Sequence, residues 1–234
     1  MTSVASTGTE GAATALLVLI AAFYMRGLKR RRGADGRMIA RAIIFVSGLV
    51  LFAIALVWPL PWLSGSLFFV HEGQIFILRM IGPLLIALSR PQGLLLVGLP
   101  RPMKRALVVR PLTNARVRTI LGLPTKPITA TALLIGVLVF WQIPRFHDLS
   151  LASPWIDLVM HLTFLLSGLA FWLRIFDLRP DPKGTPFGIR LMMLWLTMLS
   201  GIALGSYTTL KQTVLYEAYG LGVRAYGFTP LGDE

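Results

Sequence analysis

Six apolar blocks, each about as long as a bilayer is thick, limit what this chain can fold into. They lie at about 11–26, 40–59, 68–88, 128–143, 155–176 and 188–210. A helix needs about 20 consecutive apolar residues to cross the hydrocarbon core. Inside lipid the backbone must satisfy its own hydrogen bonds, and blocks of this length do so as helices. The sequence therefore predicts an all-α, polytopic transmembrane bundle of about six spans, forming a single domain over 1–234.

The composition agrees with a membrane protein. Hydrophobic residues make up 55% of the chain and charged residues 14%, whereas a soluble domain carries about 25% charged residues. The chain has no cysteine, which excludes disulfides, thiolate metal sites and cysteine-ligated iron–sulfur clusters. The formal net charge is +13, but the basic residues lie in the loops between the apolar blocks. We therefore expect anionic lipid headgroups as their partners, and no nucleic acid.

Lysine and arginine are abundant in every second loop. The segments 26–41, 90–126 and 174–190 hold seven, eight and four of them. The other three regions outside the blocks hold three in total. Because positively charged loops stay in the cytoplasm, we predict that the basic segments are cytoplasmic. Both termini, including a short tail at about 211–234, then lie on the outer side of the membrane.

The apolar stretch within 90–126 is too short to be a clear span. Residues 92–97 are apolar, and residues 101–118 are basic with scattered Leu and Val. Two interpretations remain open: a piece lying on the inner face and held by anionic lipid, or a solvated loop. A seventh span through this segment would break the alternation of charge.

Three ionisable side chains interrupt the third apolar block at His71, Glu72 and Arg79. One charge at the centre of a bilayer costs about 2.5–3.5 kcal/mol on insertion scales. Glu72 and Arg79 are seven positions apart, so a helix places them on one face. We predict that they face the interior of the bundle and that their pairing reduces this cost.

A second polar group opens the fifth block. Asp157 and His161 are four positions apart, so they share a helix face, and the loop before them holds His147 and Asp148. With the predicted orientation, all three histidines of the chain lie on the outer side. Imidazole with carboxylate suits copper, zinc or iron. The same groups also serve as interhelical hydrogen-bond partners that pin a bundle, and the spacing alone leaves both interpretations open.

Small and sulfur-containing side chains recur in the blocks. Gly201 and Gly205 form a small-xxx-small pair, which allows close helix approach in lipid, and Gly168 and Gly48 are candidates for the same role. Methionine offers a soft ligand to copper, although inside spans it more often serves packing. The methionines in question are Met80, Met160 and Met198.

Short motifs recur in a fixed order along the blocks. They are His71-x-x-Gln74 and Pro83-Leu84-Leu85-Ile86-Ala87-Leu88-Ser89-Arg90-Pro91 in the third block, His161-Leu162-Thr163-Phe164, Gly168-Leu169 and Phe171-Trp172 in the fifth, and Ala203-Leu204-Gly205, Leu215-Tyr216 and Tyr219 at and after the sixth. In the order and spacing of these motifs, over about 58 to 220, the chain resembles the CtaG family of cytochrome c oxidase assembly factors, the caa3-type group. The resemblance implies a helical protein of the bacterial inner membrane that helps to deliver copper to the oxidase.

Three positions at which the family's pattern has histidine hold other residues here. They are Ile75, Gln142 and Asp157. His147 stands where the family often has tyrosine, and Arg79 stands where an apolar residue is usual. The resemblance therefore leaves His71 and His161 as metal ligands, with Asp157 as an oxygen ligand or as the partner of a ligating histidine.

The function that the resemblance implies is that of an assembly factor and not of an enzyme. It would hold copper and pass it to cytochrome c oxidase, with oxidase or other respiratory subunits and membrane lipids as partners. The altered ligand positions favour an alternative, an accessory or structural subunit of a respiratory complex that has lost metal binding. A haem protein with His71 and His161 as axial ligands is a third and less favoured interpretation.

Overall fold

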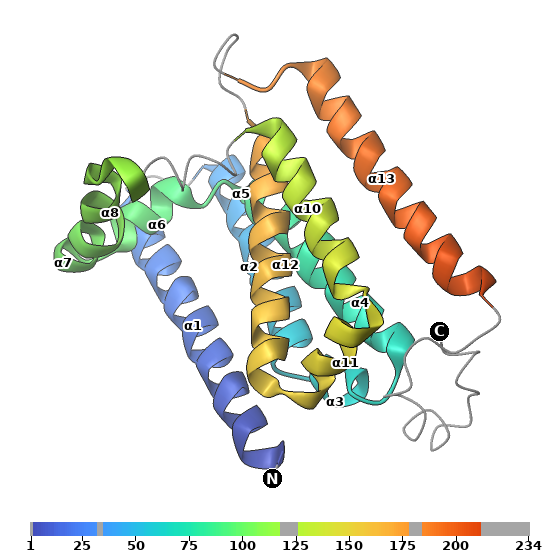
Figure 1. The fold of residues 1–234 in the computed structure, drawn as a ribbon. Coiled ribbons are helices and arrows are strands. Elements are labelled where there is room, and N and C mark those ends of the chain that lie inside the picture. Colours follow the sequence, from blue (N-terminus) through green and yellow to red (C-terminus); the bar gives the residue numbers. More distant parts are fainter. Residues whose placement is uncertain (1, 32–34, 118–125, 178–183, 212–234) are drawn as a thin grey trace.

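Helices make up the chain in the computed structural model (Figure 1). The structure describes residues 2–31, 35–117, 126–177 and 184–211, and this part of the chain contains no strand. The predicted all-α fold is confirmed. The tail beyond residue 211, which includes Leu215, Tyr216 and Tyr219 of the resemblance, lies outside the described residues.

Five helical segments are long and apolar enough to cross a membrane. They are most of α1 (Thr2–Arg30), α2 (Gly36–Leu56) with the short α3 (Leu60–Ser64), the run of α4 (Phe68–Phe76), η1 (Ile77–Ile81) and α5 (Gly82–Ser89), α12 (Pro154–Ile175) and α13 (Phe187–Leu210). A sixth passes the same test only as a bent pair, α10 (Pro127–Trp141) followed by α11 (Pro144–Ala152). This agrees with the prediction of about six spans.

The chain bends sharply at the end of the fourth predicted block, 128–143. α10 ends at Trp141, and α11 leaves it at an angle of 76°. The cause is Pro144, which lacks an N–H group and disfavours helical geometry in the residue before it. Ile143 is accordingly extended, with φ −68° and ψ 121°. α11 therefore turns back across the end of the bundle.

The third block forms one continuous segment with a π-helical turn, η1, in its middle. Pro83 supplies the local reason, because it has no N–H group to offer to the carbonyl of Arg79 four residues earlier. Instead the N–H of Gly82 donates to the carbonyl of Ile77, five residues earlier. Gly168 of α12 passes directly beside the Arg79 carbonyl, since a Cβ at Gly168 would lie 2.1 Å from that oxygen.

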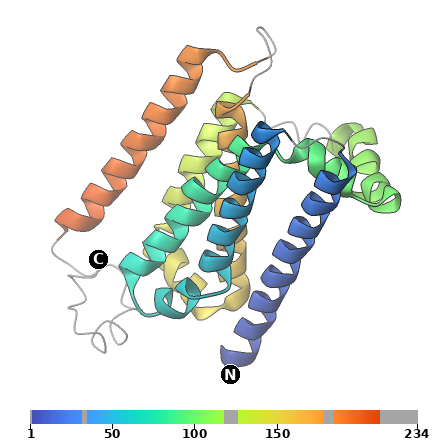
Figure 2. The same cartoon turned by 180° about the vertical axis from the view of Figure 1, so that it is seen from behind.

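The centre of the bundle is formed by α2, the α4–α5 segment, α10 and α12, as both views show (Figures 1 and 2). α2 packs along α5, and α12 packs against α5, η1 and α10. Aromatic and aliphatic side chains fill the space between them. They include Phe45, Phe52, Leu78, Leu138 and Phe164, each with less than a tenth of its surface exposed.

Two long helices stand at the sides of this centre. α1 packs on α2 and on α6 (Gln92–Gly98), whereas α13 rests on α10 and leans away from the bundle along the rest of its length (Figure 1). Close to α10, Met193 of α13 packs with Ala130 and Leu134. The wide exposed surface of both helices is the surface that lipid would cover.

The basic segment after α5 forms short helices outside the bundle. After α6 come α7 (Arg101–Lys104), η2 (Arg105–Val109) and α8 (Arg110–Thr113), grouped beside the C-terminal end of α1 (Figures 1 and 2). Residues 118–125 lie outside the described residues. No candidate span falls in the described part of this segment.

Candidate functional site

The three histidines of the chain come together at one end of the bundle. His71 comes from α4, His147 from α11 and His161 from α12. The ring centres of His71 and His147 are 5.0 Å apart, and those of His71 and His161 are 6.3 Å apart. All three side chains are buried, with exposed fractions of 1%, 0% and 7%. We call these three residues the histidine cluster.

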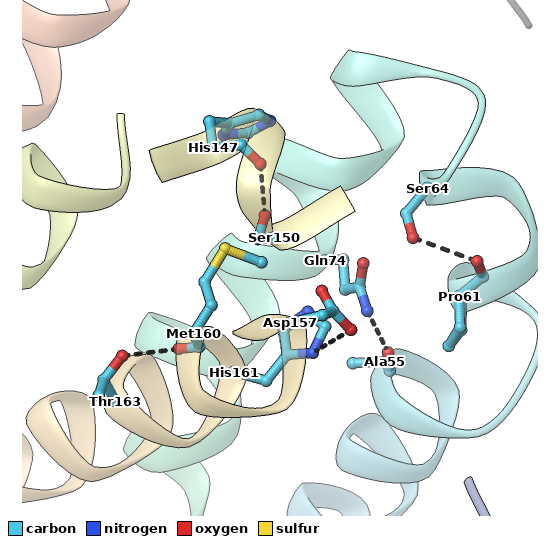
Figure 3. Close-up of polar contacts among 10 residues, drawn as sticks. All are labelled: Ala55, Pro61, Ser64, Gln74, His147, Ser150, Asp157, Met160, His161 and Thr163. Atoms are coloured by element: carbon cyan, nitrogen blue, oxygen red, sulfur yellow. Dashed lines mark hydrogen bonds and ion pairs between the residues drawn. The ribbon is translucent and has the colours of Figure 1, made fainter. Parts of the chain in front are cut away.

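The break between α10 and α11 places His147 in the cluster. Because α11 turns back at Pro144, the His147 ring lies beside that of His71 instead of continuing away from the bundle. The Nδ1 atom of His147 is 3.3 Å from the carbonyl oxygen of Trp141, the last residue of α10. The hydroxyl of Ser150 donates to the His147 carbonyl at 2.6 Å (Figure 3). His147 is thus in contact with the last residue of α10 through its ring and with Ser150 of α11 through its carbonyl.

His161 is held by a residue one turn before it on α12. Its Nδ1 atom lies 3.3 Å from Oδ2 of Asp157 (Figure 3). A carboxylate oxygen accepts, so Nδ1 carries the proton and Nε2 of the neutral ring keeps its lone pair. Nε2 of His161 is buried and has no hydrogen-bond partner within the described residues. Metal-binding histidines commonly have this arrangement, with the second nitrogen bound to a carboxylate.

The same reasoning applies to His147. A backbone carbonyl accepts only, so a hydrogen bond to Trp141 requires the proton on Nδ1 of His147. The Nε2 atom is then the nitrogen that can bind a ligand. Two of the three rings therefore have their tautomer set by an outer partner, one a carboxylate and the other a carbonyl. The predicted role of Asp157 as the partner of a ligating histidine fits this geometry better than direct ligation does.

Gln74 and Met160 border the cluster. The Gln74 side chain donates from Nε2 to the Ala55 carbonyl at 2.7 Å and so ties α4 to α2. Its Oε1 atom is buried and has no hydrogen-bond partner within the described residues. The Met160 side chain is fully buried and points from α12 toward α11 (Figure 3). The site thus offers a carbonyl oxygen and a thioether in addition to the imidazoles.

The predicted pair of Glu72 and Arg79 is not a direct ion pair. The Glu72 carboxylate accepts a hydrogen bond of 2.5 Å from Nε2 of Gln142. Arg79 is buried, with 8% of its surface exposed, and within the described residues no ion pair or side-chain hydrogen bond joins it. The two groups attract each other electrostatically without direct contact.

The other positions that depart from the family's pattern have structural roles. Ile75 is buried in the main apolar core, with 2% of its surface exposed. Gln142 binds Glu72 and so joins the end of α10 to α4. Neither residue adds a nitrogen ligand to the histidine cluster.

The separations within the cluster suit two imidazoles on one ion. With a metal–nitrogen distance of about 2 Å, ring centres lie about 5 to 6.5 Å apart. The measured 5.0 and 6.3 Å fall in this range. However, in the described part of the chain no three His, Asp or Glu side chains are already arranged to hold an ion. Binding would require rotation of the rings about their side-chain bonds.

The sequence places all three histidines on the outer side but names only His71 and His161 as ligands. The close approach of His147 to His71 was not predicted. The signal lay in Pro144, three residues earlier, which predicts a break in the helix. The angle of that break, which decides where His147 goes, is a property of the packed structure.

Comparison with known proteins identified one family. The family model described as cytochrome c oxidase caa3 assembly factor, Caa3_CtaG, matches residues 22–234, which is nearly the full chain. No curated protein and no solved structure matched the chain.

Proposed function

The chain belongs to the family of cytochrome c oxidase caa3 assembly factors, and we propose that it serves this assembly by holding copper in the histidine cluster. His71, His147 and His161 would be the ligands, and Asp157 would orient His161. The copper is cargo that passes to the oxidase, and no catalytic step is assigned to this chain. The protein would act in the bacterial inner membrane, with oxidase subunits as its partners.

The convergence of the histidines carries this proposal. The chain has only three histidines among 234 residues, and all three are buried within one small region. Burying a polar ring without a hydrogen bond at each nitrogen is unfavourable. Even so, Nε2 of His161 has no such partner in the described part of the chain. A bound ion would satisfy it.

The donor set favours copper over hard cations. Calcium and magnesium prefer oxygen ligands, whereas imidazole suits copper and zinc, and thioether selects Cu(I). The cluster offers imidazole nitrogens, with the buried Met160 thioether beside them. Zinc has the same preference for imidazole but gains less from the thioether. The metal content of the purified protein therefore distinguishes the two.

An incomplete ligand cage agrees with a carrier. A site that is meant to release its ion benefits from few ligands and an open side. Asp157 supplies the open side, since 38% of its side chain is exposed while its His161 partner is buried. A partner that approaches Asp157 could disturb the hydrogen bond that holds His161 and so loosen the ion.

The test is the copper content of gently solubilised protein. We expect about one copper ion per chain in the wild type and a loss of most of it in a His71→Ala, His161→Ala double variant. Gln142→His is the matched variant in which copper binding should increase, because it restores a histidine of the family's pattern at the edge of the cluster. An equal copper content in wild type and double variant would contradict the proposal.

A second function rests on a different observation. The hydrogen bond between Gln142 and Glu72 joins α10 to α4 at the position where the family's pattern has histidine. This favours an accessory subunit in which the polar residues brace the bundle and bind no metal. Such a subunit would stay with respiratory subunits through purification in detergent, whereas a copper carrier would be recovered largely alone.

A further inference from the structure

A second polar region lies at the opposite end of the bundle from the histidine cluster. There the end of α1, the start of α2 and the turn from α5 to α6 line a cavity of about 620 Å³ that is open to the outside. Its lining residues are Arg31, Asp35, Arg37, Met38, Arg41, Ser89, Arg90, Gly93 and Leu94. We call it the arginine cavity. It shares no residue with the histidine cluster.

The arginine cavity has a strong excess of positive charge. Four arginines line it against one aspartate, which leaves a formal charge of +3. The aspartate is already engaged, because Asp35 caps α2 and its Oδ1 accepts from the Met38 N–H group at 2.8 Å. Within the described residues no ion pair or side-chain hydrogen bond joins the four guanidinium groups. All four arginines are exposed, so an anion from the surroundings can reach their guanidinium groups without displacing a protein partner.

The backbone of Arg90, one of the four arginines, has an unusual conformation. The residue ends α5 in the left-handed region, with φ 51° and ψ 57°, and is the one non-glycine residue with positive φ in the described chain. Glycine, or sometimes asparagine, is usual at such a helix end. A larger residue costs about 1 kcal/mol or more there. The Arg90 side chain is exposed and lines the cavity, so its guanidinium group is available to an anion there.

We propose that the arginine cavity binds a phosphate-bearing anion, with the headgroup of an anionic membrane lipid as its source. Guanidinium groups bind phosphate oxygens in a bidentate manner. The cavity lies where candidate spans end, which is the level of the headgroups. Leu94 and Met38 give it an apolar wall beside the arginines, as a glycerol with acyl chains requires. Free phosphate has the same anionic group without the apolar part.

A bound headgroup would hold together elements that have few polar ties of their own. α1 and α6 already approach closely, since a Cβ at Gly98 would lie 1.8 Å from the carbonyl oxygen of Phe23. Beyond this contact, Arg30 donates to the Val97 carbonyl at 3.0 Å. An anion among Arg31, Arg41 and Arg90 would join α1, α2 and the α5–α6 turn by charge.

The test measures binding by the full-length protein purified in neutral detergent. The probes are phosphatidylglycerol, phosphatidylcholine and inorganic phosphate, and the readouts are the lipid retained in native mass spectrometry and the rise in Tm. Arg90→Gly is the central variant, because it removes the guanidinium group and also relieves the left-handed backbone. Lys29→Gln is the matched control, since it removes a charge of the same sign from the same end of α1 without touching the cavity.

We expect phosphatidylglycerol to be retained and phosphatidylcholine not. Arg90→Gly and Arg41→Gln should each lower the amount of phosphatidylglycerol retained about fivefold. Lys29→Gln should retain as much as the wild type. Arg90→Gly should show this loss without a lower Tm in the absence of lipid, which separates binding from folding. Binding of inorganic phosphate with the same dependence on Arg90 would support the anion site and identify a soluble source.

Equal retention by Arg90→Gly and Lys29→Gln, or equal retention of both lipids, would overturn the proposal. The result does not depend on copper. The His71→Ala, His161→Ala variant should bind phosphatidylglycerol as the wild type does, so either proposal can fail alone.

Discussion

At the scale of single residues, the outer partner of each histidine decides what the cluster can bind. Asp157 holds Nδ1 of His161 at 3.3 Å, and the Trp141 carbonyl lies at the same distance from Nδ1 of His147. Both contacts direct the other ring nitrogen to a ligand. The spacing of Asp157 and His161 predicted the first contact, because four positions make one helical turn. The second joins residues on either side of the bend between α10 and α11. Helical spacing does not predict contacts between residues of two different helices.

Changing Asp157 tests whether this outer partner matters for the metal. In Asp157→Asn the amide oxygen still accepts from Nδ1 of His161, but the negative charge is lost, and Asp157→Ala loses both. We expect copper affinity to fall about 10-fold for Asn and about 100-fold for Ala, measured by competition with a copper chelator. Asp35→Asn, at the other end of the bundle, is the control. Equal affinities in all four proteins would remove Asp157 from the site.

Arg79 offers a prediction on stability. Its guanidinium group is buried and has no direct partner within the described residues, so its desolvation is poorly offset. We expect Arg79→Met, with a flexible apolar side chain of similar length, to raise the free energy of unfolding by about 1–4 kcal/mol. Thermal unfolding in detergent measures this as a higher Tm. Arg79→Lys keeps the charge and should bring no such gain, and a lower Tm in Arg79→Met would mean that the charge holds the bundle together.

At the scale of elements, the glycines that the sequence marked for close helix packing can be compared with the packing in the structure. The sequence singled out Gly168 and Gly48, and the structure packs other helices directly against both. It also singled out Gly201 and Gly205, but in the described part of the chain nothing lies within 4 Å of where their Cβ atoms would be. A pair of small residues says that a helix face can be approached closely. Whether another helix faces it depends on how the whole bundle packs, and here α13 leans away.

Gly168 and Gly201 therefore form a matched pair of alanine substitutions. A Cβ at Gly168 would lie 2.1 Å from the Arg79 carbonyl oxygen, and backbone cannot move as a flexible side chain can. We expect Gly168→Ala to lower the free energy of unfolding by about 1–3 kcal/mol. Gly201→Ala should change it by less than about 0.5 kcal/mol. The measurement is the Tm of the two variants in the same detergent, and equal Tm values would show that α12 is not held against the π-helical turn.

At the scale of the whole molecule, the chain keeps two kinds of polar chemistry at its two ends. The histidine cluster lies where α11 meets α4 and α12, and the arginine cavity lies where α1 ends and α2 begins; these elements are at opposite ends of the bundle (Figure 1). Apolar block length was enough to predict the all-α bundle, because lipid leaves few alternatives for the backbone. The change of direction after the fourth block was not predicted. The sequence turns from strongly apolar in α10 to mixed in α11, which marks the end of the block, but the direction that α11 takes depends on how it packs across the bundle.

The orientation of the molecule in the membrane is the remaining prediction. The positive segments predict that the arginine cavity faces the cytoplasm and the histidine cluster the outer side. Because the chain has no cysteine, single cysteines can be introduced and labelled without background. Arg145→Cys in α11 and Thr113→Cys in α8 are exposed positions at the two ends.

In spheroplasts, a maleimide that cannot cross membranes should label Arg145→Cys fully, and it should label Thr113→Cys only after permeabilisation. The unaltered chain should take up no label in either condition. The physical reason is that translocating the eight basic residues of segment 90–126 across the membrane is strongly disfavoured, whereas the region around Arg145 carries a single one. Labelling of Thr113→Cys in intact spheroplasts would reverse the orientation. Copper held by the histidine cluster would then face the cytoplasm, and transfer to an outer site of the oxidase would have to be abandoned.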